Sequence, residues 1–273
     1  MPRIKINEVE IFYELKGEGD IPIVLVHGSW VSHQHWELIQ ASLGEKFKVL
    51  SYDRRGHSES ERLQGQGSIT EDVGDLAGLI ERFKMNPALV IGHSFGAVIS
   101  MRLAGVRPEL IRGLILHEPP LFSLLADEPD FSPILEATQK KVKRVVELIK
   151  KGKNEDAARE FIEKIVSSPG AWTEIPGEMK KVLIHNAPTF LDEAQDPEKV
   201  VFKSDWVRSF SKPALLTYGE ESPPHFVSVV RKLSKIIPGS EVQEITGAGH
   251  SPLRTHPEKY SEILKAFIFK HWG

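Results

Sequence analysis

The chain has 273 residues, of which 40% are hydrophobic and 27% are charged, the ordinary composition of a globular protein with a substantial core. Its formal net charge of −3 provides no basic field to attract phosphates, so we expect no nucleic-acid partner. Because it contains no cysteine, disulfides, a thiol nucleophile and thiolate metal ligands are excluded.

The start of the chain and its apolar runs bear on cellular location. Residues 1–6 alternate and then carry charge, unlike the apolar core of a signal peptide. No apolar run approaches the ~18 residues that a membrane span requires. We therefore expect no membrane association and, since cysteine is absent, a cytoplasmic protein.

In chain order, short apolar runs of strand type alternate with amphipathic runs of helical period. Strands are predicted at 4–7, 9–15, 23–26, 48–52, 88–92, 113–117, 214–218 and 241–245. Helices are predicted at 34–42, 70–84, 96–107, 225–237 and 257–269. The second helix has a capping-box start, because Ser68 is followed three residues later by Glu71. This alternation predicts an α/β fold with a mostly parallel sheet of eight strands and helices on both faces.

The segment from Pro119 to about Asp205 interrupts the alternation. It contains helix-like stretches near 132–151, 154–167 and 177–190 and no clear strand. Because it lies between two strands of the predicted sheet, we interpret it as a helical lid, which would exclude water and shape a pocket. The expected domains are a core of residues 1–119 and 206–273 and a helical lid of residues 120–205.

The first motif, His27-Gly28-Ser29-Trp30, directly follows the predicted strand at 23–26. A turn here would aim the backbone N–H of Ser29 toward a nucleophile presented by a neighbouring strand. Together with the N–H of Phe95, it would bind a developing oxyanion. His27 fits a buried hydrogen-bonding residue better than a catalytic one.

The second motif is Gly92-His93-Ser94-Phe95-Gly96, a G-x-S-x-G pattern between a predicted strand and a predicted helix. A strand, a tight turn and a helix form the context in which a serine is presented as a nucleophile. The flanking glycines suit a strained turn in which chain segments approach closely. Ser94 is therefore the candidate nucleophile.

A third motif, Gly247-Ala248-Gly249-His250, follows the last predicted strand. A serine hydroxyl needs a base within hydrogen-bond reach because its own pKa is too high for attack. A histidine on a glycine-rich loop late in the chain would supply that base. We therefore predict that His250 is the partner of Ser94.

Four segments, in this order and at these spacings, resemble the α/β-hydrolase superfamily. They are His27-Gly28, Asp53-Arg54-Arg55-Gly56-His57-Ser58-Glu59-Ser60, Gly92 to Gly96 and Gly247 to His250. The resemblance covers essentially the whole chain except about 120–205, and it is more specific for the fold than for the substrate. It implies an α/β-hydrolase fold and a triad in which a carboxylate orients His250.

The superfamily most often places this acid three residues beyond the glycine that ends the seventh predicted strand. Here that glycine is Gly219, and the third residue on is Ser222, which cannot act as a carboxylate. Some members, including zearalenone-type lactonases and one group of haloalkane dehalogenases, carry the acid at the end of the preceding strand, where this chain has Glu118. We therefore predict Glu118 as the acid and keep Glu221 and Glu220, in the usual loop, as alternatives.

A serine at position 94 separates this chain from the superfamily's dehalogenases and epoxide hydrolases, which use an aspartate there. The resemblance thus implies acyl transfer to water, and we predict a serine hydrolase that cleaves carboxylic esters or lactones of small molecules through an acyl-enzyme. No metal or organic cofactor is required. Thioester hydrolysis, carbon–carbon hydrolysis and perhydrolysis use the same triad, and a slow-hydrolysing or non-catalytic ligand receptor is the alternative of a different class.

Apolar walls of the substrate pocket are expected from four aromatic residues, Trp30, Phe122, Trp172 and Trp206. A metal site of His33, His35 and His57 is disfavoured, because the first two are two residues apart and do not share a helix face. A monomer and a homodimer are both compatible with the sequence.

Overall fold

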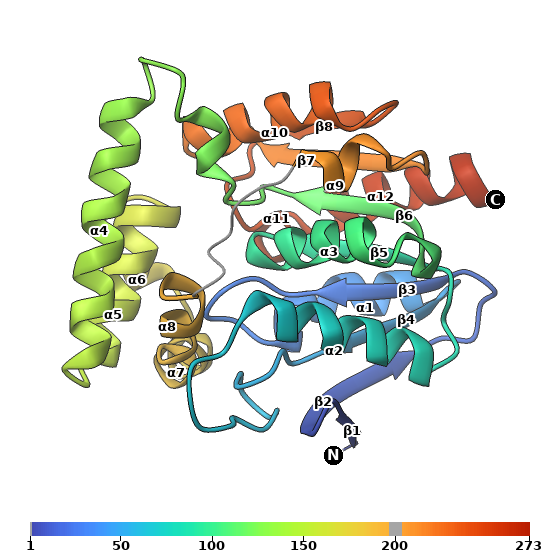
Figure 1. Cartoon of the computed structure of the whole chain (residues 1–273), viewed down its shortest axis with the longest axis horizontal. Helices are drawn as coiled ribbons and strands as arrows, with labels where there is room; N and C mark the ends of the chain where they lie inside the picture. The colour runs from blue at the N-terminus through green and yellow to red at the C-terminus, as the bar shows by residue number, and fades with distance from the viewer. Residues whose placement is uncertain (1, 197–203) are drawn as a thin grey trace.

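The computed structural model describes residues 2–196 and 204–273. Eight strands form one sheet, namely β1 (Arg3–Ile6), β2 (Val9–Lys16), β3 (Pro22–Val26), β4 (Lys48–Tyr52), β5 (Ala88–His93), β6 (Ile111–His117), β7 (Ala214–Gly219) and β8 (Glu241–Ile245). Their order in the sheet is β1-β2-β4-β3-β5-β6-β7-β8 (Figure 1). Only the two ladders that involve β2 are antiparallel. The predicted α/β fold with a mostly parallel sheet of eight strands is thus confirmed.

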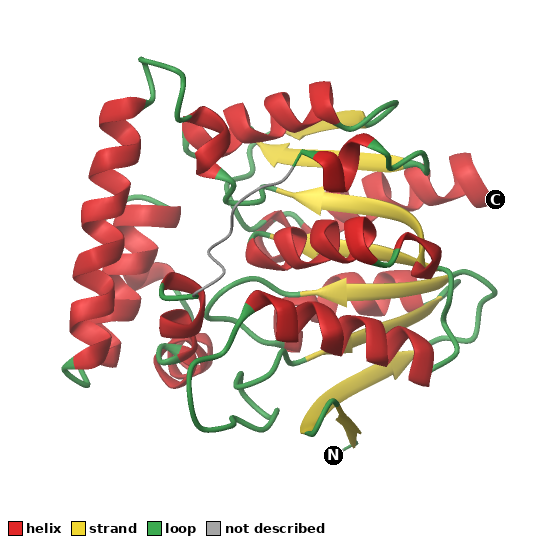
Figure 2. Ribbon diagram, viewed as in Figure 1, coloured by secondary structure: helices red, strands yellow, loops and turns green. Residues whose placement is uncertain are grey.

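Helices cover both faces of the sheet (Figure 2): α2 (Ile69–Arg82), α3 (Phe95–Val106) and α10 (Pro224–Ile236) on one, and α1 (Glu37–Gly44) and α12 (Pro257–Trp272) on the other. Val24 and Val26 of β3 pack against the first group. Ile23 and Leu25 of the same strand pack against the second. Because successive side chains of a strand point to opposite faces, a central strand buried on both faces is apolar at every position.

The helix boundaries follow the sequence signals closely. The capping box is present: Ser68 Oγ accepts the N–H of Glu71, and the Glu71 carboxylate accepts the N–H of Ser68 at 2.9 Å. The helix predicted at 34–42 differs at its start, where a 3₁₀ turn, η1 (His33–Trp36), precedes α1. Shorter elements complete the core, namely the 3₁₀ turn η2 (Pro108–Leu110) and the helix α11 (Pro252–Thr255).

We call the segment between β6 and β7 the helical insertion. Its described elements are η3 (Phe122–Leu125), α4 (Ser132–Lys150), α5 (Asn154–Phe161), η4 (Ile162–Val166), α6 (Ala171–Glu174), α7 (Gly177–Asn186) and α8 (Thr189–Ala194). The helix predicted at 177–190 is two helices, because Pro188 lacks the N–H that would continue the first. Helices α4 to α8 lie beyond the carboxyl ends of the parallel strands (Figure 2), where α/β proteins place their ligands.

The helical insertion buries an apolar cluster of its own. Leu148, Leu183 and Phe190 belong to it, and Trp30 from the loop after β3 packs among them. The chain rejoins the core at α9 (Asp205–Arg208), which contacts α3. Among the described residues, no helix combines the length and the apolar character that a membrane crossing requires.

Candidate active site

Ser94 occupies the turn between β5 and α3. β5 ends at His93, α3 begins at Phe95, and Ser94 between them has φ 54° and ψ −122°. A positive φ is costly for a residue with a Cβ and persists only where the surroundings enforce it. The Ser94 N–H donates to the carbonyl of His117, at the end of β6, over 2.8 Å. The fold thus holds this serine in a strained conformation at the carboxyl ends of the central strands.

The two glycines of the turn are required because neighbouring backbone atoms lie where a Cβ would be. A Cβ on Gly92 would lie 2.5 Å from the Cα of Ala97, within the same turn. A Cβ on Gly96 would lie 2.3 Å from the carbonyl oxygen of Val26, so α3 begins against the end of β3. Neither obstacle is a flexible side chain, and any larger residue would move the serine away from its neighbours.

His250, on the loop after β8, meets the carboxylate of Glu118. Its Nδ1 donates to Glu118 Oε2 over 2.5 Å, while Glu118 Oε1 accepts the N–H of Gly219 over 2.7 Å. Burial raises the pKa of Glu118, but the neighbouring imidazoles of His117 and His250 outweigh burial and lower that pKa to about 2. A charged carboxylate therefore orients the imidazole at neutral pH.

The two alternative acids lie elsewhere. Both Glu220 and Glu221 are exposed. Glu220 Oε2 accepts the N–H of Gly247 over 2.8 Å, which ties the loop after β7 to the loop that carries His250. Of the three carboxylates considered from the sequence, the structure brings Glu118 to the histidine.

Ser94 and His250 are connected through His93, the last residue of β5. His93 Nε2 donates to the carbonyl of His250 over 2.7 Å. Phe226, from α10, packs on the His250 ring with 4.5 Å between ring centroids. Among the described residues, no hydrogen bond joins Ser94 Oγ to the His250 ring, a common condition before substrate binds.

The backbone amides predicted to bind an oxyanion flank Ser94. Phe95 is the first residue of α3, so its N–H has no partner within the helix. On the other side, a Cβ on Gly28 would lie 3.0 Å from Ser94 Cβ, which shows how closely the loop after β3 passes the serine. Ser29 and Phe95 line the same cavity as Ser94.

A cavity of about 720 Å³ opens in front of Ser94. Its wall is mainly apolar and combines Phe226 of the core with Leu135, Val142, Phe161 and Phe190 of the helical insertion. Of the residues that the structure describes, two with charged side chains reach it, the exposed Lys143 and the buried Glu193. The arrangement suits a substrate whose bulk is uncharged and apolar.

Of the four aromatic residues predicted as pocket walls, Phe122 lines this cavity. Trp30 and Trp172 do not, because both are buried in the apolar cluster of the helical insertion. Trp30 stacks on Phe161 with 4.9 Å between ring centroids, and it is Phe161 that faces the cavity. The side chain of Trp206 lies outside the described part of the chain.

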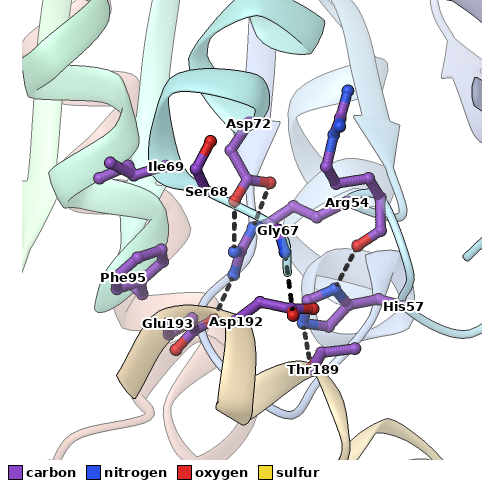
Figure 3. A pocket seen from close by; sticks show the side chains of 11 residues that line it. Arg54, His57, Gly67, Ser68, Ile69, Asp72, Phe95, Thr189, Asp192 and Glu193 are labelled. Atoms are coloured by element: carbon purple, nitrogen blue, oxygen red, sulfur yellow. Dashed lines mark hydrogen bonds and ion pairs between the residues drawn. The ribbon is translucent and has the colours of Figure 1, made fainter. Parts of the chain in front are cut away.

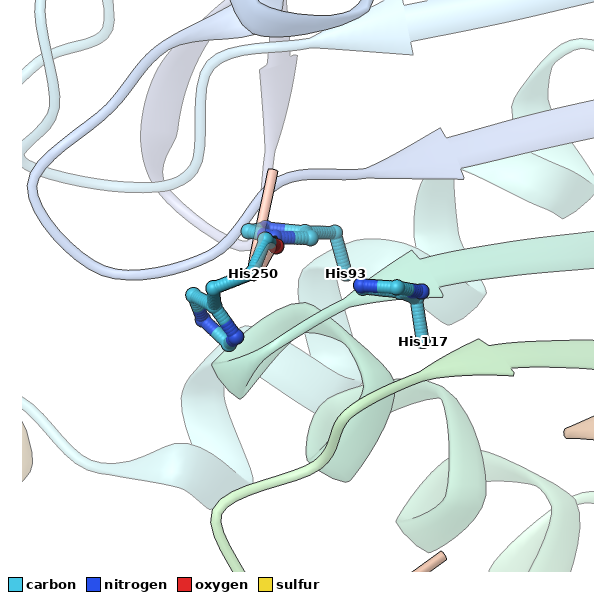
Figure 4. A group of neighbouring side chains, drawn as sticks. All are labelled: His93, His117 and His250. Carbon is cyan, nitrogen blue, oxygen red and sulfur yellow. The ribbon is translucent and has the colours of Figure 1, made fainter. Parts of the chain in front are cut away.

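His93, His117 and His250 form a cluster at the carboxyl ends of β5, β6 and β8 (Figure 4). One ring nitrogen from each lies within 4.8 Å of the others, a spacing that a metal ion could bridge. One nitrogen of each ring is hydrogen-bonded, that of His93 to the His250 carbonyl, that of His117 to Thr217 Oγ1 and that of His250 to Glu118. These bonds fix the orientation of the three imidazoles beside Ser94.

The remaining histidines of the sequence motifs have structural partners. His27 is fully buried, and its Nε2 accepts the N–H of Arg54 over 2.9 Å. His33 Nδ1 bonds to Asp53 over 2.8 Å, and His57 Nε2 bonds to Thr189 over 2.9 Å. Their ring nitrogens thus hold loops in place.

Burial lowers the pKa of six histidines below the ordinary 6.5: His27, His35, His57, His93, His117 and His225. The pKa is about 3 for His35 and about 4 for His117. Between the lowered pKa of each histidine and pH 6.5, the imidazole is protonated in the unfolded chain but neutral in the folded chain. The free energy of unfolding therefore falls as pH falls, by up to about 1.4 kcal/mol per pH unit for each histidine.

We therefore expect the free energy of unfolding in urea to decrease steadily from about pH 7.5 to pH 5. His256→Gln, at a partly exposed histidine, should leave the slope unchanged, because it leaves the six buried histidines in place. Equal free energies of unfolding across this range would contradict the expectation.

A mostly parallel eight-stranded sheet, a serine in a strained turn after β5 and a carboxylate-bound histidine after β8 together define an α/β hydrolase. The family model described as the alpha/beta hydrolase family matches residues 23–263. Since that match spans most of the chain, the protein belongs to the alpha/beta hydrolase family.

Individual relatives span nearly the whole chain at low identity. 2-(Acetamidomethylene)succinate hydrolase of Mesorhizobium japonicum is 23% identical over 282 residues, which cover 97% of this chain and 94% of the relative. A thermophilic esterase from Thermogutta terrifontis superposes with a TM-score of 0.80 and 24% identity, covering 99% of this chain and all of that structure (100%). The enol-lactonase from Burkholderia xenovorans LB400 superposes with a TM-score of 0.74 and 19% identity, covering 98% of this chain and 100% of that structure. At such identities these structures show the shared fold.

Sequence reasoning missed several residues that the structure brings to the cavity. Phe226, Phe161 and Phe190 belong to amphipathic helices, where the apolar pattern does not tell the cavity side from the packed side. Glu193 carries no motif and is 139 residues from the arginine that it binds. Its one signal is a carboxylate on a helix that otherwise packs into the core.

Proposed function

We propose that the protein is a serine hydrolase that cleaves carboxylic esters or lactones of small molecules. The observation that carries the proposal is the strained Ser94 on the wall of an apolar cavity, next to a histidine whose Nδ1 is held by a buried carboxylate. A hydroxyl nucleophile, a base and an orienting acid are the three parts of acyl transfer to water.

The residues would act in sequence. Ser94 Oγ attacks the substrate carbonyl while His250 Nε2 takes its proton, and Glu118 stabilises the imidazolium that forms. The N–H groups of Ser29 and Phe95 bind the oxyanion of the tetrahedral intermediate. His250 then protonates the leaving alcohol, and water attacks the acyl-enzyme with His250 as base. A lactone follows the same course, with the leaving alcohol still joined to the acyl group.

The cavity favours substrates with an uncharged, apolar acyl or alcohol group. Its wall is mainly aromatic and aliphatic, and the buried Glu193 would repel a substrate carboxylate. The printed names of two structural neighbours, an esterase and an enol-lactonase, agree with this chemistry. The relative named for a succinate derivative acts on a dicarboxylate, for which the described part of this cavity offers the exposed Lys143.

The test is turnover of p-nitrophenyl esters from acetate to decanoate and of simple lactones, together with labelling by a fluorophosphonate. We expect many turnovers per protein molecule, higher kcat/KM for acyl chains longer than acetate, and a label on Ser94 in the peptide map. Reaction that stops after about one equivalent would instead indicate a receptor. A label on another residue would reject the mechanism.

We also infer that residues 120–205 act as a lid over Ser94. Support comes from α4, which contributes Leu135, Thr138 and Val142 to the roof of the cavity and has few buried residues. Helices with few buried contacts open at low free energy. Amides of α4 and α5 should therefore exchange hydrogen faster than those of β5 and β6. Protection of α4 equal to that of the sheet would argue for a fixed roof.

A further inference from the structure

Arg54, which follows β4, is a buried arginine with two carboxylate partners (Figure 3). Its Nε and Nη2 donate to the two oxygens of Asp72 on α2, over 3.0 and 2.8 Å. Its Nη1 donates to Glu193 Oε1 on α8 over 2.9 Å. The Arg54 side chain is 2% exposed and that of Glu193 is 6% exposed, so the ion pairs are shielded from water.

The second oxygen of Glu193 binds Ser29. Ser29 Oγ donates to Glu193 Oε2 over 2.5 Å, so one carboxylate holds the arginine with one oxygen and the loop after β3 with the other. The Arg54 guanidinium also lies over the ring of Phe95, 4.8 Å from its centroid. Arg54 and Glu193 therefore contact both residues whose backbone amides flank Ser94.

An oxyanion is stabilised well only by donors that are already in position, because reorienting a donor during the reaction costs part of what it contributes. The loop after β3 needs external support for this, since Trp30, the residue after Ser29, has a positive φ of 70°. The bond from Ser29 Oγ fixes the side chain of the residue whose N–H must point at the substrate. The carboxylate that accepts it belongs to the helical insertion.

We propose that Glu193 is a positioning residue: held by Arg54, it fixes Ser29 so that the Ser29 N–H points at the oxyanion. The inference rests on the proposed serine mechanism and goes beyond it, because it makes the helical insertion part of the oxyanion site. Removal of the insertion's α8 would then affect the chemical step as well as access to the cavity.

Glu193→Gln is the sharpest variant. An amide has nearly the same shape, but once its oxygen accepts from Arg54, its NH₂ faces Ser29 Oγ and can only donate to it. The charge-assisted bond from Ser29 to a carboxylate is then replaced by a weaker neutral bond of opposite direction. We expect kcat to fall about 10- to 100-fold, less than the 10²–10³ lost when an oxyanion donor is removed outright. KM should change less than about threefold, since the substrate ground state does not depend on this donor. Inactivation by a phosphonate ester, whose tetrahedral adduct needs the same donor, should slow in parallel with kcat.

Ser29→Ala tests the same link from the other side. It removes the hydroxyl but leaves the backbone amide and both Arg54 ion pairs, so it stays informative even if Glu193→Gln fails to fold. The variant that combines Glu193→Gln with Ser29→Ala should lose no more activity than the worse single variant, because both changes act on the same hydrogen bond between Ser29 and Glu193. Independent, multiplicative losses would overturn the proposal.

Asp192→Asn is the matched control. Asp192 is the preceding residue of α8 and docks the same helix on the core, through Arg62 Nη2 over 3.1 Å and the N–H of Gly67 over 3.1 Å, without touching Ser29. It should lower stability and leave kcat within about twofold. A loss in Glu193→Gln no larger than in Asp192→Asn, or a loss that appears in KM alone, would overturn the positioning role.

Ser94→Ala, measured alongside, separates this inference from the proposed function. If Ser94→Ala is inactive while Glu193→Gln keeps full kcat, the serine mechanism stands and the positioning role is rejected. If Ser94→Ala keeps its activity, the proposed function falls and the positioning role falls with it.

Discussion

Replacing Ser94 by alanine should reduce kcat/KM for ester hydrolysis by about four to six orders of magnitude. The reason is that the variant lacks the atom that forms the acyl-enzyme in the proposed mechanism, while the other groups of the site stay in place. Alanine has a Cβ like serine, so the turn at φ 54° carries the same strain and the fold should be kept. Initial rates on the best p-nitrophenyl ester measure the loss of activity, and a thermal melt of each variant shows whether the fold is kept.

A matched control lies on α3, the helix that begins directly after Ser94. Ser100 is fully buried and its Oγ donates to the carbonyl of Gly96 over 2.7 Å, so Ser100→Ala removes a hydroxyl close to the turn without removing the nucleophile. This variant should keep its activity within a few-fold and should still be labelled by a fluorophosphonate. Comparable turnover in Ser94→Ala and the parent protein would reject the serine mechanism.

Glu118→Gln should lower kcat by about 10⁴-fold, as expected when the histidine is held in the wrong tautomer. The N–H of Gly219 donates to Glu118 Oε1, so the glutamine oxygen will take that place and its NH₂ will face His250 Nδ1. Nδ1 must then accept, which puts the imidazole proton on Nε2, the atom that has to receive the proton of Ser94. Single-turnover rates of acylation measure this step directly.

The same change has a signature in the pH profile. With a pKa of about 2, Glu118 is charged wherever the enzyme works and stabilises a protonated imidazole beside it. Glutamine carries no charge at any pH, so the loss of kcat in Glu118→Gln should be similar throughout the pH range in which the parent protein is active. A loss that shrinks toward acid pH would show that the carboxylate of the parent protein is protonated there and does not act as a charged partner of His250.

Glu220→Gln and Glu221→Gln are the controls for this assignment. Both side chains are exposed, and the carboxylate of Glu220 is bonded to the backbone of Gly247. Each substitution should change kcat less than about fivefold, because solvent screens exposed charges. A larger loss in either variant than in Glu118→Gln would move the acid to the loop after β7.

The fold was predictable from the chain because its signals are local and repeated. Each central strand is a short apolar run, α2 and α10 are clearly amphipathic, and the capping box at Ser68 marks a helix start within one residue. The resemblance to the superfamily also pointed to Glu118: the position where most members carry the acid is Ser222 in this chain, and some members carry the acid at the end of the preceding strand, where this chain has Glu118.

The walls of the cavity were not predictable in the same way. Trp30 belongs to the motif after β3 and is aromatic, yet it is fully buried in the apolar cluster of the helical insertion. Phe161, which it supports, belongs to a helix whose pattern indicates only that one face is apolar. Which of two apolar surroundings a side chain enters depends on how the helices pack, and that packing leaves no local pattern.

Ser94 and Glu118, at the ends of neighbouring strands, both have left-handed backbone torsions, with φ 54° and 45°. Such a torsion costs about 1–3 kcal/mol for a residue with a Cβ and almost nothing for glycine. Glycine at position 118 would leave the buried N–H of Gly219 without its acceptor, but at position 94 selection for heat resistance alone would favour glycine, where the proposed mechanism requires a hydroxyl. Thermal tolerance and reactivity therefore compete at this peptide unit, so improvement of this scaffold for hot processes must score both properties in every round.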